Sequence, residues 1–318
     1  MRNTRYGFLV LLSSLLMLTG CSRRELLDDY PVSGVDIKLD WNGVTDKLPE
    51  GVRVIFYPKS AEGRKIDTYL SVRGGKVKVP PGRYSVVAYN YDTETVQIRG
   101  EEAYETIEAF TGYCNGLGIA GTEKMVWGPD PLYVVQINDL HIANSEEELL
   151  LDWKPKLVVK TYSFKIKVEG LEYVSSIVGS VEGMAGCYCL GRCCGMMNDA
   201  PIYFEAQGCS GEVTGSFTAF GLPEGAMSRA SLAIKFTLAF VKVDNTVQKI
   251  EVDITDVIVN SESGEGGGND EPSKDIELPL DDDEVKVDKP ENSSGGDGGI
   301  GGDVGDWGEE EEVPLPVI

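Results

Sequence analysis

The chain has 318 residues, with 52 acidic against 29 basic side chains and a net charge of −23 at pH 7. Phosphate contacts need clustered Lys and Arg, so an acidic chain with no basic stripe argues against nucleic-acid binding. A single histidine, His141, excludes mechanisms that need two, and no G-x-S-x-G stretch presents a serine nucleophile. These observations exclude particular mechanisms, and we predict a protein that is not an enzyme and that uses no cofactor.

The first twenty residues have the features of an export signal. Two arginines precede an apolar stretch from Gly7 to Leu18, which is too short to span a membrane comfortably. The following Leu18-Thr19-Gly20-Cys21 resembles the lipobox of bacterial lipoproteins. Processing there would remove residues 1–20 and attach acyl chains to Cys21. An ordinary signal peptide with a chance cysteine is the alternative, and we predict Cys21 as the lipid attachment residue.

A lipid on Cys21 makes the membrane a predicted partner of the mature chain. Each buried methylene of an acyl chain contributes about 0.8 kcal/mol, so several chains give a stable anchor. Residues 21–30 would then form a lipid-tethered linker. The linker sequence Ser22-Arg23-Arg24 does not resemble an inner-membrane retention signal. We therefore predict a lipid-anchored protein of the outer membrane, with exposure at the cell surface left open.

Residues 31–155 are predicted to form a first β-sandwich. The segments "VDIKLDW", "GVRVIFYP", "GGKVKVP", "GRYSVVAYNYD" and "PLYVVQINDLHI" alternate apolar and polar residues and are bounded by Gly, Pro, Asn or Asp. Such alternation predicts half-buried strands. His141 comes at the end of the last of these segments and is predicted as a strand-end residue.

Residues 156–288 repeat this pattern and predict a second β-sandwich. A long strand signature follows Pro155, and no long helical crossover interrupts the later strands, which disfavours a parallel sheet. The fold class is thus all-β, with two antiparallel β-sandwich domains in tandem. A flexible loop is predicted at 260–273, after which "KDIELPL" returns to the second domain. Residues 289–318 are predicted to form an acidic, Gly-rich tail.

Three glycine-rich or acidic motifs carry weak predictions. Gly116–Gly121 matches G-x-G-x-x-G but lacks the strand before it and the helix after it that a dinucleotide site needs. The tail segment "GGDGGIGGD" lacks the Asp that calcium-binding repeats place where Ile300 stands. The run Asp281–Glu284 is predicted to be a solvated charge run. We therefore predict no metal site.

Four cysteines, Cys187, Cys189, Cys193 and Cys194, lie close together in "GCYCLGRCCGMM". Four thiolates could bind zinc, but the spacing lacks the C-x2-C pairs that pre-form such sites. Disulfides or free thiols in an exposed hairpin are favoured over buried cysteines with no special role, and zinc is the third alternative. In an exported protein oxidation competes with metal binding.

Several segments together resemble a known family. The lipobox followed by "RREL", the strand "IKLDW", then "PEGVRVIFYP", "VPPGRYSVVAYNYDTE", "ITDVI" and the closing "VGDWGEEEEVPLP" are similar to Bacteroides-type lipoproteins of unknown function related to fimbrial anchoring subunits. The similarity covers nearly all of the mature chain. It implies two transthyretin-like β-sandwich domains, a lipid on Cys21 and a structural or adhesive role at the base of a cell-surface fimbrium.

The resemblance also implies a partner and leaves other functions open. Fimbrial subunits would bind by adding a strand to a neighbour's sheet. A glycan-binding surface lipoprotein is the alternative, for which Trp41, Trp127 and Trp153 are candidate platforms, although strand tryptophans often belong to the core. A carboxylate-based hydrolase is a third hypothesis, but nothing in the sequence pairs two acids in one site.

Overall fold

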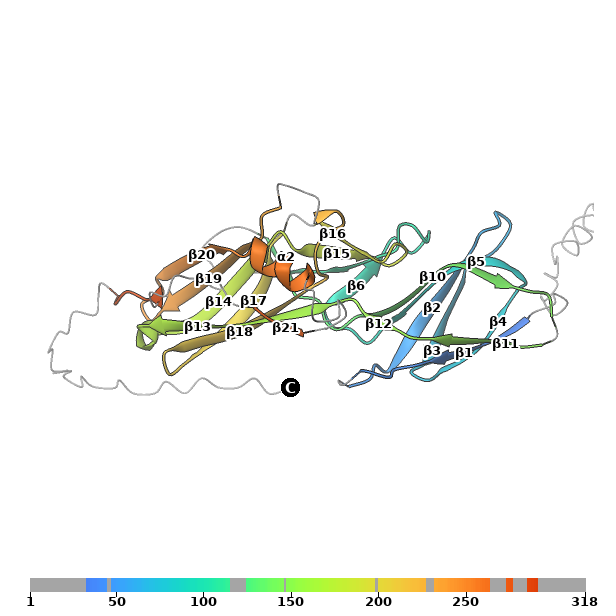
Figure 1. The fold of residues 1–318 in the computed structure, drawn as a ribbon, viewed down its shortest axis with the longest axis horizontal. Helices are drawn as coiled ribbons and strands as arrows, with labels where there is room; N and C mark the ends of the chain where they lie inside the picture. Colours follow the sequence, from blue (N-terminus) through green and yellow to red (C-terminus); the bar gives the residue numbers. More distant parts are fainter. Residues whose placement is uncertain are drawn as a thin grey trace, which may run out of the picture.

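The computed structural model describes residues 33–44, 47–114, 124–145, 147–197, 200–226, 232–263, 273–276 and 285–290. These residues form an elongated and almost entirely β protein, with two large curled sheets end to end along its long axis and a smaller sheet near their junction (Figure 1). The predicted all-β class is confirmed.

The first large sheet contains eight strands from the first half of the chain. They are β1 (Ser33–Leu39), β2 (Gly51–Pro58), β3 (Ile66–Ser71), β4 (Gly74–Val79), β5 (Gly82–Asn90), β10 (Tyr133–Ile142), β11 (Leu149–Trp153) and β12 (Lys156–Leu157). Their order is β11-β1-β4-β3-β2-β5-β10-β12. Neighbours are antiparallel except β1 and β11, which run parallel.

The central strands of the first sheet are buried on both faces. Seven consecutive residues of β5, Tyr84–Asn90, are buried. Val86 belongs with Val35 to the core inside the curl of the sheet, whereas Val87 and Tyr89 face a second core shared with the smaller sheet. The expectation of a half-buried strand is wrong here, because a second layer covers the outer face of β5 and removes the need for alternation.

The second large sheet contains ten strands. They are β8 (Tyr113–Cys114), β9 (Met125–Trp127), β13 (Lys160–Glu169), β14 (Val174–Glu182), β17 (Ile202–Cys209), β18 (Glu212–Ala219), β19 (Lys235–Lys242), β20 (Val247–Asp253), β21 (Ser273–Asp275) and β22 (Val285–Lys286). The main order is β20-β19-β14-β17-β18-β13-β21. A 3-10 turn, η2 (Leu171–Tyr173), precedes β14, and helix α2 (Thr255–Ser263) follows β20.

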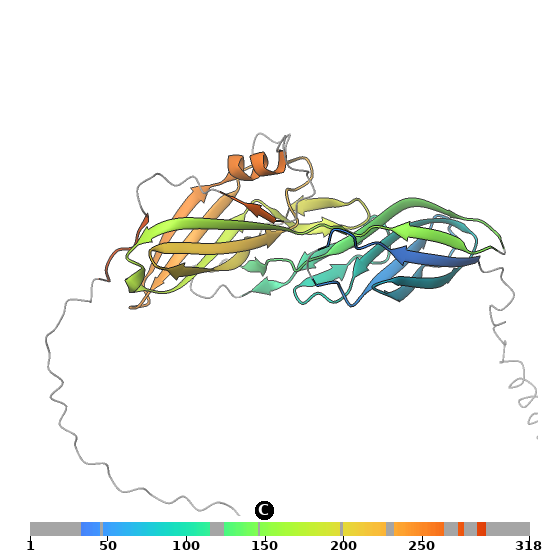
Figure 2. The same cartoon turned by 60° about the horizontal axis from the view of Figure 1, so that its bottom comes forward.

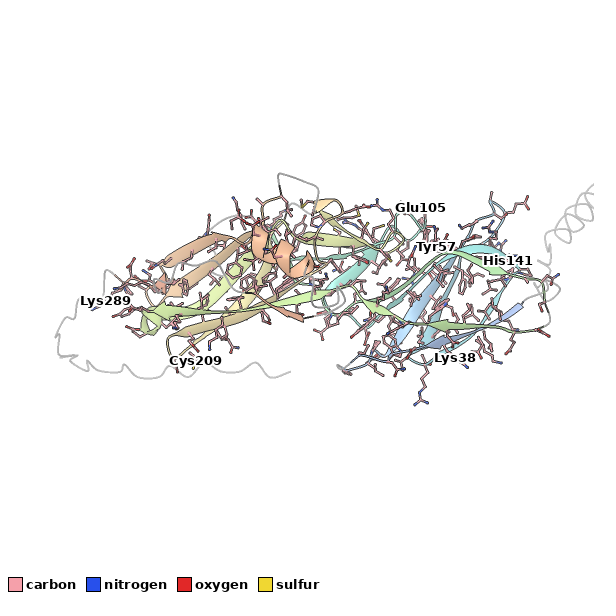
Figure 3. All side chains as sticks on the ribbon, in the orientation of Figure 1. Lys38, Tyr57, Glu105, His141, Cys209 and Lys289 are labelled. Carbon is pink, nitrogen blue, oxygen red and sulfur yellow. The ribbon has the colours of Figure 1, made fainter. Side chains whose placement is uncertain are left out.

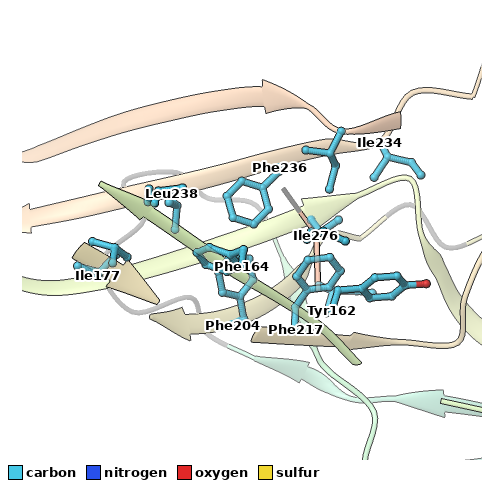
Figure 4. Close-up of a cluster of buried hydrophobic side chains, with 14 of the residues drawn as sticks. Tyr162, Phe164, Ile177, Phe204, Phe217, Ile234, Phe236, Leu238 and Ile276 are labelled. Atoms are coloured by element: carbon cyan, nitrogen blue, oxygen red, sulfur yellow. The ribbon is translucent and has the colours of Figure 1, made fainter. Parts of the chain in front are cut away.

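The concave side of the second sheet encloses the largest aromatic cluster of the described residues (Figure 4). Phe164 and Phe236 meet edge to face with centroids 5.0 Å apart, and Tyr162 stacks on Phe217 at the same separation. Such pairs contribute about 0.5–1.5 kcal/mol beyond the area they bury. Helix α2 closes one side of this core with Ile258.

The C-terminal segment completes the second sheet. Strands β21 and β22 both run parallel to β13, and the segment buries Ile276 and Val287 in the aromatic core. The predicted return of "KDIELPL" is therefore seen up to Ile276, and residues 277–284 lie outside the described residues. Helix α2 was not predicted, and it includes the first four residues of the stretch 260–273 that we predict as a loop.

A third sheet joins the two halves of the chain. It contains β6 (Val96–Arg99), β7 (Glu108–Thr111), β15 (Ala185–Cys189) and β16 (Cys194–Met197), in the order β16-β15-β7-β6. The first two strands precede the predicted boundary near residue 155 and the last two follow it. Leu190, from the β15–β16 turn, is fully buried in the core that covers the first large sheet.

The first half of the chain also contributes strands to the second large sheet. Strand β9 belongs to the first half of the chain but pairs in parallel with β17, through Val126 and Trp127. The β8–β9 hairpin then packs Cys114 and Met125 on the outer face of the second sheet. Each half of the chain therefore contributes a hairpin to the other half. The predicted division into consecutive units at 31–155 and 156–288 does not account for this exchange. The division near residue 155 remains a proposal.

Candidate docking surfaces

The predicted attachment residue, Cys21, lies outside the described residues. Strand β1 begins at Ser33, which pairs with Val79 at the end of β4. The next turn leads into β5, where Arg83 pairs with His141. His141 lies at the right-hand end of the molecule in Figure 3. The chain therefore enters the described body at the outer end of the first sheet, as Figure 2 also shows for β1, in blue.

Two adjoining hollows lie in the other half, around the turn η2. The larger, of about 730 Å³, is lined by β14, β17 and β19 together with Leu171. The smaller, of about 580 Å³, lies on the other side of η2 and is lined by Val168, Leu171 and Lys289 among others. Lys289 lies at the left-hand end in Figure 3. The hollows therefore mark the end of the molecule opposite to the start of β1.

The larger hollow combines apolar and hydrogen-bonding side chains. Val174, Val178 and Val241 supply apolar surface, and Ser176 and Gln207 supply polar groups. The strand register places Ser176 opposite Val241, so both kinds of group meet on the outer face of the sheet. An extended peptide needs both, because its side chains seek apolar contact and its backbone must keep its hydrogen bonds.

One edge of the second sheet is open among the described residues. Strand β20 pairs with β19 on one side only, whereas the opposite edge strand, β13, is covered by β21 and β22. The side chain of Gln248 in β20 donates to the Lys286 carbonyl (2.7 Å) and accepts from the Asp288 amide (3.0 Å). The C-terminal segment therefore contacts the Gln248 side chain, while the main-chain edge of β20 has no second strand partner among the described residues.

The predicted cysteine hairpin is the hairpin β15–β16. Cys189 lies directly opposite Cys194. All six described cysteines are unpaired thiols; Cys187 and Cys189 are buried, whereas Cys193 is exposed. The hairpin is therefore only partly exposed, because its first strand lies inside the third sheet. Within the described ranges, no three metal-ligating side chains are grouped to hold an ion.

The environment of Cys194 makes its thiol a weak nucleophile. Burial raises the pKa of Cys194 to about 11, and the nearby Glu224 carboxylate adds to this rise. The Cys194 Sγ donates to Glu224 Oε2 at 3.4 Å. Because the thiolate is the reactive form, this thiol is largely unreactive at neutral pH. Burial likewise raises the pKa of the Cys187 thiol.

The three candidate tryptophan platforms differ in exposure. Trp153 is 5 % exposed and belongs to the core of the first sheet. Trp41 is half-buried, donates its Nε1 proton to the Val72 carbonyl and meets Tyr133 edge to face. Only Trp127 of the three, at 43 % exposed, offers a surface. Trp41 and Trp153 are therefore structural, as aromatic residues in strands commonly are.

Of the remaining sequence motifs, only His141 lies within the described residues. His141 lies exposed near the end of β10, as predicted. The ranges 116–121, 281–284 and 295–303 lie outside the described residues. None of the helices in the described part of the chain is long and apolar enough to cross a membrane.

A polar network on the first sheet was not predicted. Arg53 of β2 donates to Asp67 from Nε (2.9 Å) and Nη2 (2.7 Å) and to Glu101 from Nη1 (2.5 Å) and Nη2 (2.8 Å). Its Nη1 also donates to the Tyr89 hydroxyl at 2.8 Å. Arg53 lowers the pKa of the Asp67 carboxyl. Asp67 therefore stays ionised and cannot serve as the general acid that a carboxylate hydrolase needs.

Comparison with known proteins places the chain in a family. The model of a domain of unknown function, DUF5119, matches residues 20–205. The chain belongs to this family. It is also 60 % identical to a proposed fimbrium anchoring subunit, Fim4B, of Bacteroides ovatus, over 334 aligned positions that cover the full length of both proteins.

Solved structures agree with the fold of this DUF5119 protein. A proposed adhesin from Bacteroides ovatus is 57 % identical, with a TM-score of 0.72 and a match covering 86 % of this chain and 98 % of that one. The fimbrial anchor protein Mfa2 from Porphyromonas gingivalis is 12 % identical, with a TM-score of 0.50 and coverage of 77 % and 89 %. The second likeness supports the fold alone. The β-sandwich fold class predicted from the sequence is confirmed.

Proposed function

We propose that this protein is a non-enzymatic anchoring subunit of a cell-surface fimbrium, held in the outer membrane by an acylated Cys21. The observation that carries the proposal is the 60 % identity to Fim4B over the full length of both chains. Identity at that level over the full length of both chains supports a shared role as well as a shared fold.

The arrangement of the body supports an anchoring role. The chain enters at the outer end of the first sheet, and the two hollows lie at the far end of the second sheet. A lipid-tethered subunit needs such an arrangement, because the end facing away from the membrane has to receive the next subunit. Several acyl chains would hold the tethered end stably in the membrane.

The open edge of β20 and the larger hollow suit a fimbrial subunit that binds by strand addition. Strand addition gives affinity through main-chain hydrogen bonds and specificity through pockets for alternate side chains. The edge offers main-chain groups, and the hollow beside Ser176 and Val241, which β14, β17 and β19 line, offers a second surface for side chains of the partner.

The lipid-attachment half of this proposal is tested with a variant of the full-length protein. Cys21→Ser removes the thiol that would carry the lipid, so the protein is expected to lose its acyl mass and leave the detergent phase. Cys209→Ser, at an exposed thiol in β17, is the matched control and should keep both properties. A Cys21→Ser protein that still carries lipid and partitions with membranes would disprove the attachment site.

The docking half is tested with Ser176→Arg, which places a long charged side chain in the larger hollow. Co-purification of fimbrial subunits from the cell envelope should be lost, while membrane partitioning is retained. Ser216→Arg, on an exposed position of the neighbouring strand β18, is the control. If subunits co-purify equally with both variants, the hollow is not the docking surface.

A further inference from the structure

An exposed pair of tyrosines lies on the outer face of the first sheet. Tyr69 of β3 is 60 % exposed and Tyr91, just after β5, is 44 % exposed. Their rings meet edge to face, with centroids 5.3 Å apart and an interplanar angle of 78°. Single exposed aromatic residues are common, but here two of them are held together in a fixed arrangement.

Gly51 allows this pair to form across strand β2. A side chain at Gly51 would come within 2.5 Å of the Leu70 carbonyl and 3.1 Å of the Tyr91 ring. Because Gly51 has no side chain, the Tyr91 ring can lie across β2 and reach Tyr69 on the next strand. The two rings therefore form an angled aromatic surface with a glycine beneath it.

The Arg53 network lies directly beside the aromatic pair. Arg53 is opposite Tyr69 in the strand register, and its guanidinium lies 5.8 Å from the centre of that ring. A guanidinium has five N–H donors, and the five hydrogen bonds to Asp67, Glu101 and Tyr89 use them all. Arg53 is therefore a positioning residue that holds two carboxylates beside the rings.

The two carboxylates keep the capacity to accept further hydrogen bonds. A carboxylate has about four acceptor positions, and Arg53 occupies two on Asp67 and two on Glu101. Both side chains are partly exposed, at 29 % and 28 %. A ligand that meets them has to bring donors, such as hydroxyl groups.

Within the Arg53 network itself, two positive and two negative side chains balance. Arg53 and Lys65 are positive, and the Lys65 Nζ donates to the backbone carbonyl of Glu101 at 3.1 Å. Asp67 and Glu101 are negative. An anionic ligand would meet two carboxylates and a cationic ligand would meet two basic groups, so neither is favoured over a neutral ligand.

A hollow of about 560 Å³ lies farther along β2. It is lined by Tyr57, Lys65 and Glu105 among others, and Figure 3 shows Tyr57 and Glu105 close together. Positions 51 and 57 of one strand lie roughly 20 Å apart. Ile55 lies between them and is fully buried under the third sheet, so the tyrosine pair and this hollow are separate surfaces.

We propose that Tyr69, Tyr91, Asp67 and Glu101 form a binding site for a neutral oligosaccharide. A sugar ring offers an apolar C–H face to a tyrosine and hydroxyl donors to carboxylates, and it carries no charge. This match covers each feature of the surface. The site is separate from the hollows of the docking end, so its test and the test of the anchoring role can fail independently.

The test titrates the full-length protein with four neutral hexasaccharides, of α-glucan, β-1,4-glucan, β-1,3-glucan and β-mannan, and with oligogalacturonate as an anionic probe. We expect saturable binding of at least one neutral probe. Tyr69→Ala should weaken it at least ten-fold, whereas Tyr69→Phe keeps the ring and should retain it. Tyr113→Ala, at a tyrosine 65 % exposed on β8, is the control and should bind as the unaltered protein does.

Three results would overturn the proposal: no binding of any neutral probe, binding of oligogalacturonate alone, or binding that Tyr69→Ala leaves unchanged. The unfolding midpoint of each variant is measured in parallel. Tyr69 is mostly exposed, so its replacement should leave the midpoint unchanged. Tyr69→Phe provides a second readout, because it removes only the hydroxyl, whereas Tyr69→Ala removes the ring as well. Comparing their affinities separates the contribution of the ring from that of the hydroxyl.

Discussion

The two large sheets curl in similar ways, but their outer faces differ. The third sheet covers the central strands of the first sheet, so that Ile55 and Val87 are fully buried on its outer side. The outer face of the second sheet carries only the β8–β9 hairpin among the described residues, over Val178 and Tyr203, and the rest borders the larger hollow. The outer face of the first sheet is thus covered at its central strands, whereas that of the second sheet is largely uncovered among the described residues and is the face that we propose for docking.

The two sheets also differ in how their edges are closed. In the second sheet, the C-terminal segment pairs with β13 and reaches Gln248 of β20. In the first sheet, β11 and β12 end the order, and no strand from the described C-terminal segment joins them. The second sheet therefore depends on strands near the C-terminus of the described chain. A C-terminal truncation should weaken this sheet and leave the first sheet intact.

The largest effect is expected from truncation after Ser263. This removes Ile276 and Val287, which are 5 % and 1 % exposed, and uncovers the edge of β13. Burial of each such side chain contributes roughly 1.5–3 kcal/mol, so the free energy of unfolding should fall by about 3–6 kcal/mol. Denaturant unfolding measures the loss.

Truncation after Pro290 is the control for this prediction. The residues removed are mostly glycine and acidic residues, so the midpoint should stay close to that of the full chain. Hydrogen exchange should quicken in β13 and β20 of the shorter protein and remain unchanged in β2 and β5. Equal midpoints for both truncations would show that the C-terminal segment does not stabilise the second sheet.

Because the two halves exchange hairpins, a substitution in the second half of the chain should destabilise strands of the first half. Leu190 follows the predicted boundary in sequence, but its side chain is fully buried against the first sheet. Leu190→Ala should lower the free energy of unfolding by about 2–5 kcal/mol, through lost burial and the cavity left behind. Hydrogen exchange should quicken in β2 and β5, which come from the other half of the chain.

Met197→Ala is the matched control for Leu190→Ala. Met197 belongs to the same hairpin, but its side chain is 45 % exposed. Its loss should change the free energy of unfolding little. If Leu190→Ala quickens exchange only in strands of the second half, the hairpin does not stabilise the first sheet as described.

The strands could be predicted from the sequence, but their neighbours could not. Alternation in "GGKVKVP" located β4, because burial of one face imposes a period of two. The pairing of β7 with β15 joins residues far apart in the chain, and local periodicity carries no information about such partners. Helix α2 was missed because it is short and buries few residues, so it lacks a clear helical stripe.

The candidate sites were predictable only in part. Cys21 was predicted from a local motif and stays a prediction, because it lies outside the described residues. The tryptophans drew attention as large aromatic residues, but Trp153 is core and the exposed pair is Tyr69 and Tyr91. The alternation of "IDTYLS" places Asp67 and Tyr69 on one face of β3, which is a signal for their proximity. Their partners Arg53 and Glu101 come from distant segments.

The smallest effect concerns Asp67, which links β3 to β2 on the first sheet. Arg53 lowers the pKa of Asp67 in the folded protein below the ordinary value of 3.8. A lowered folded-state pKa stabilises the protein above the unfolded-state value, and that contribution is lost as the pH falls through the folded-state value. Asp67→Asn should therefore lower the free energy of unfolding by about 1 kcal/mol or less at pH 7, since the pair is partly exposed. Urea unfolding from pH 7 to pH 2 measures this difference, which should shrink below about pH 4. A difference that is constant over the whole range would mean that the ion pair does not contribute and that the amide merely packs less well.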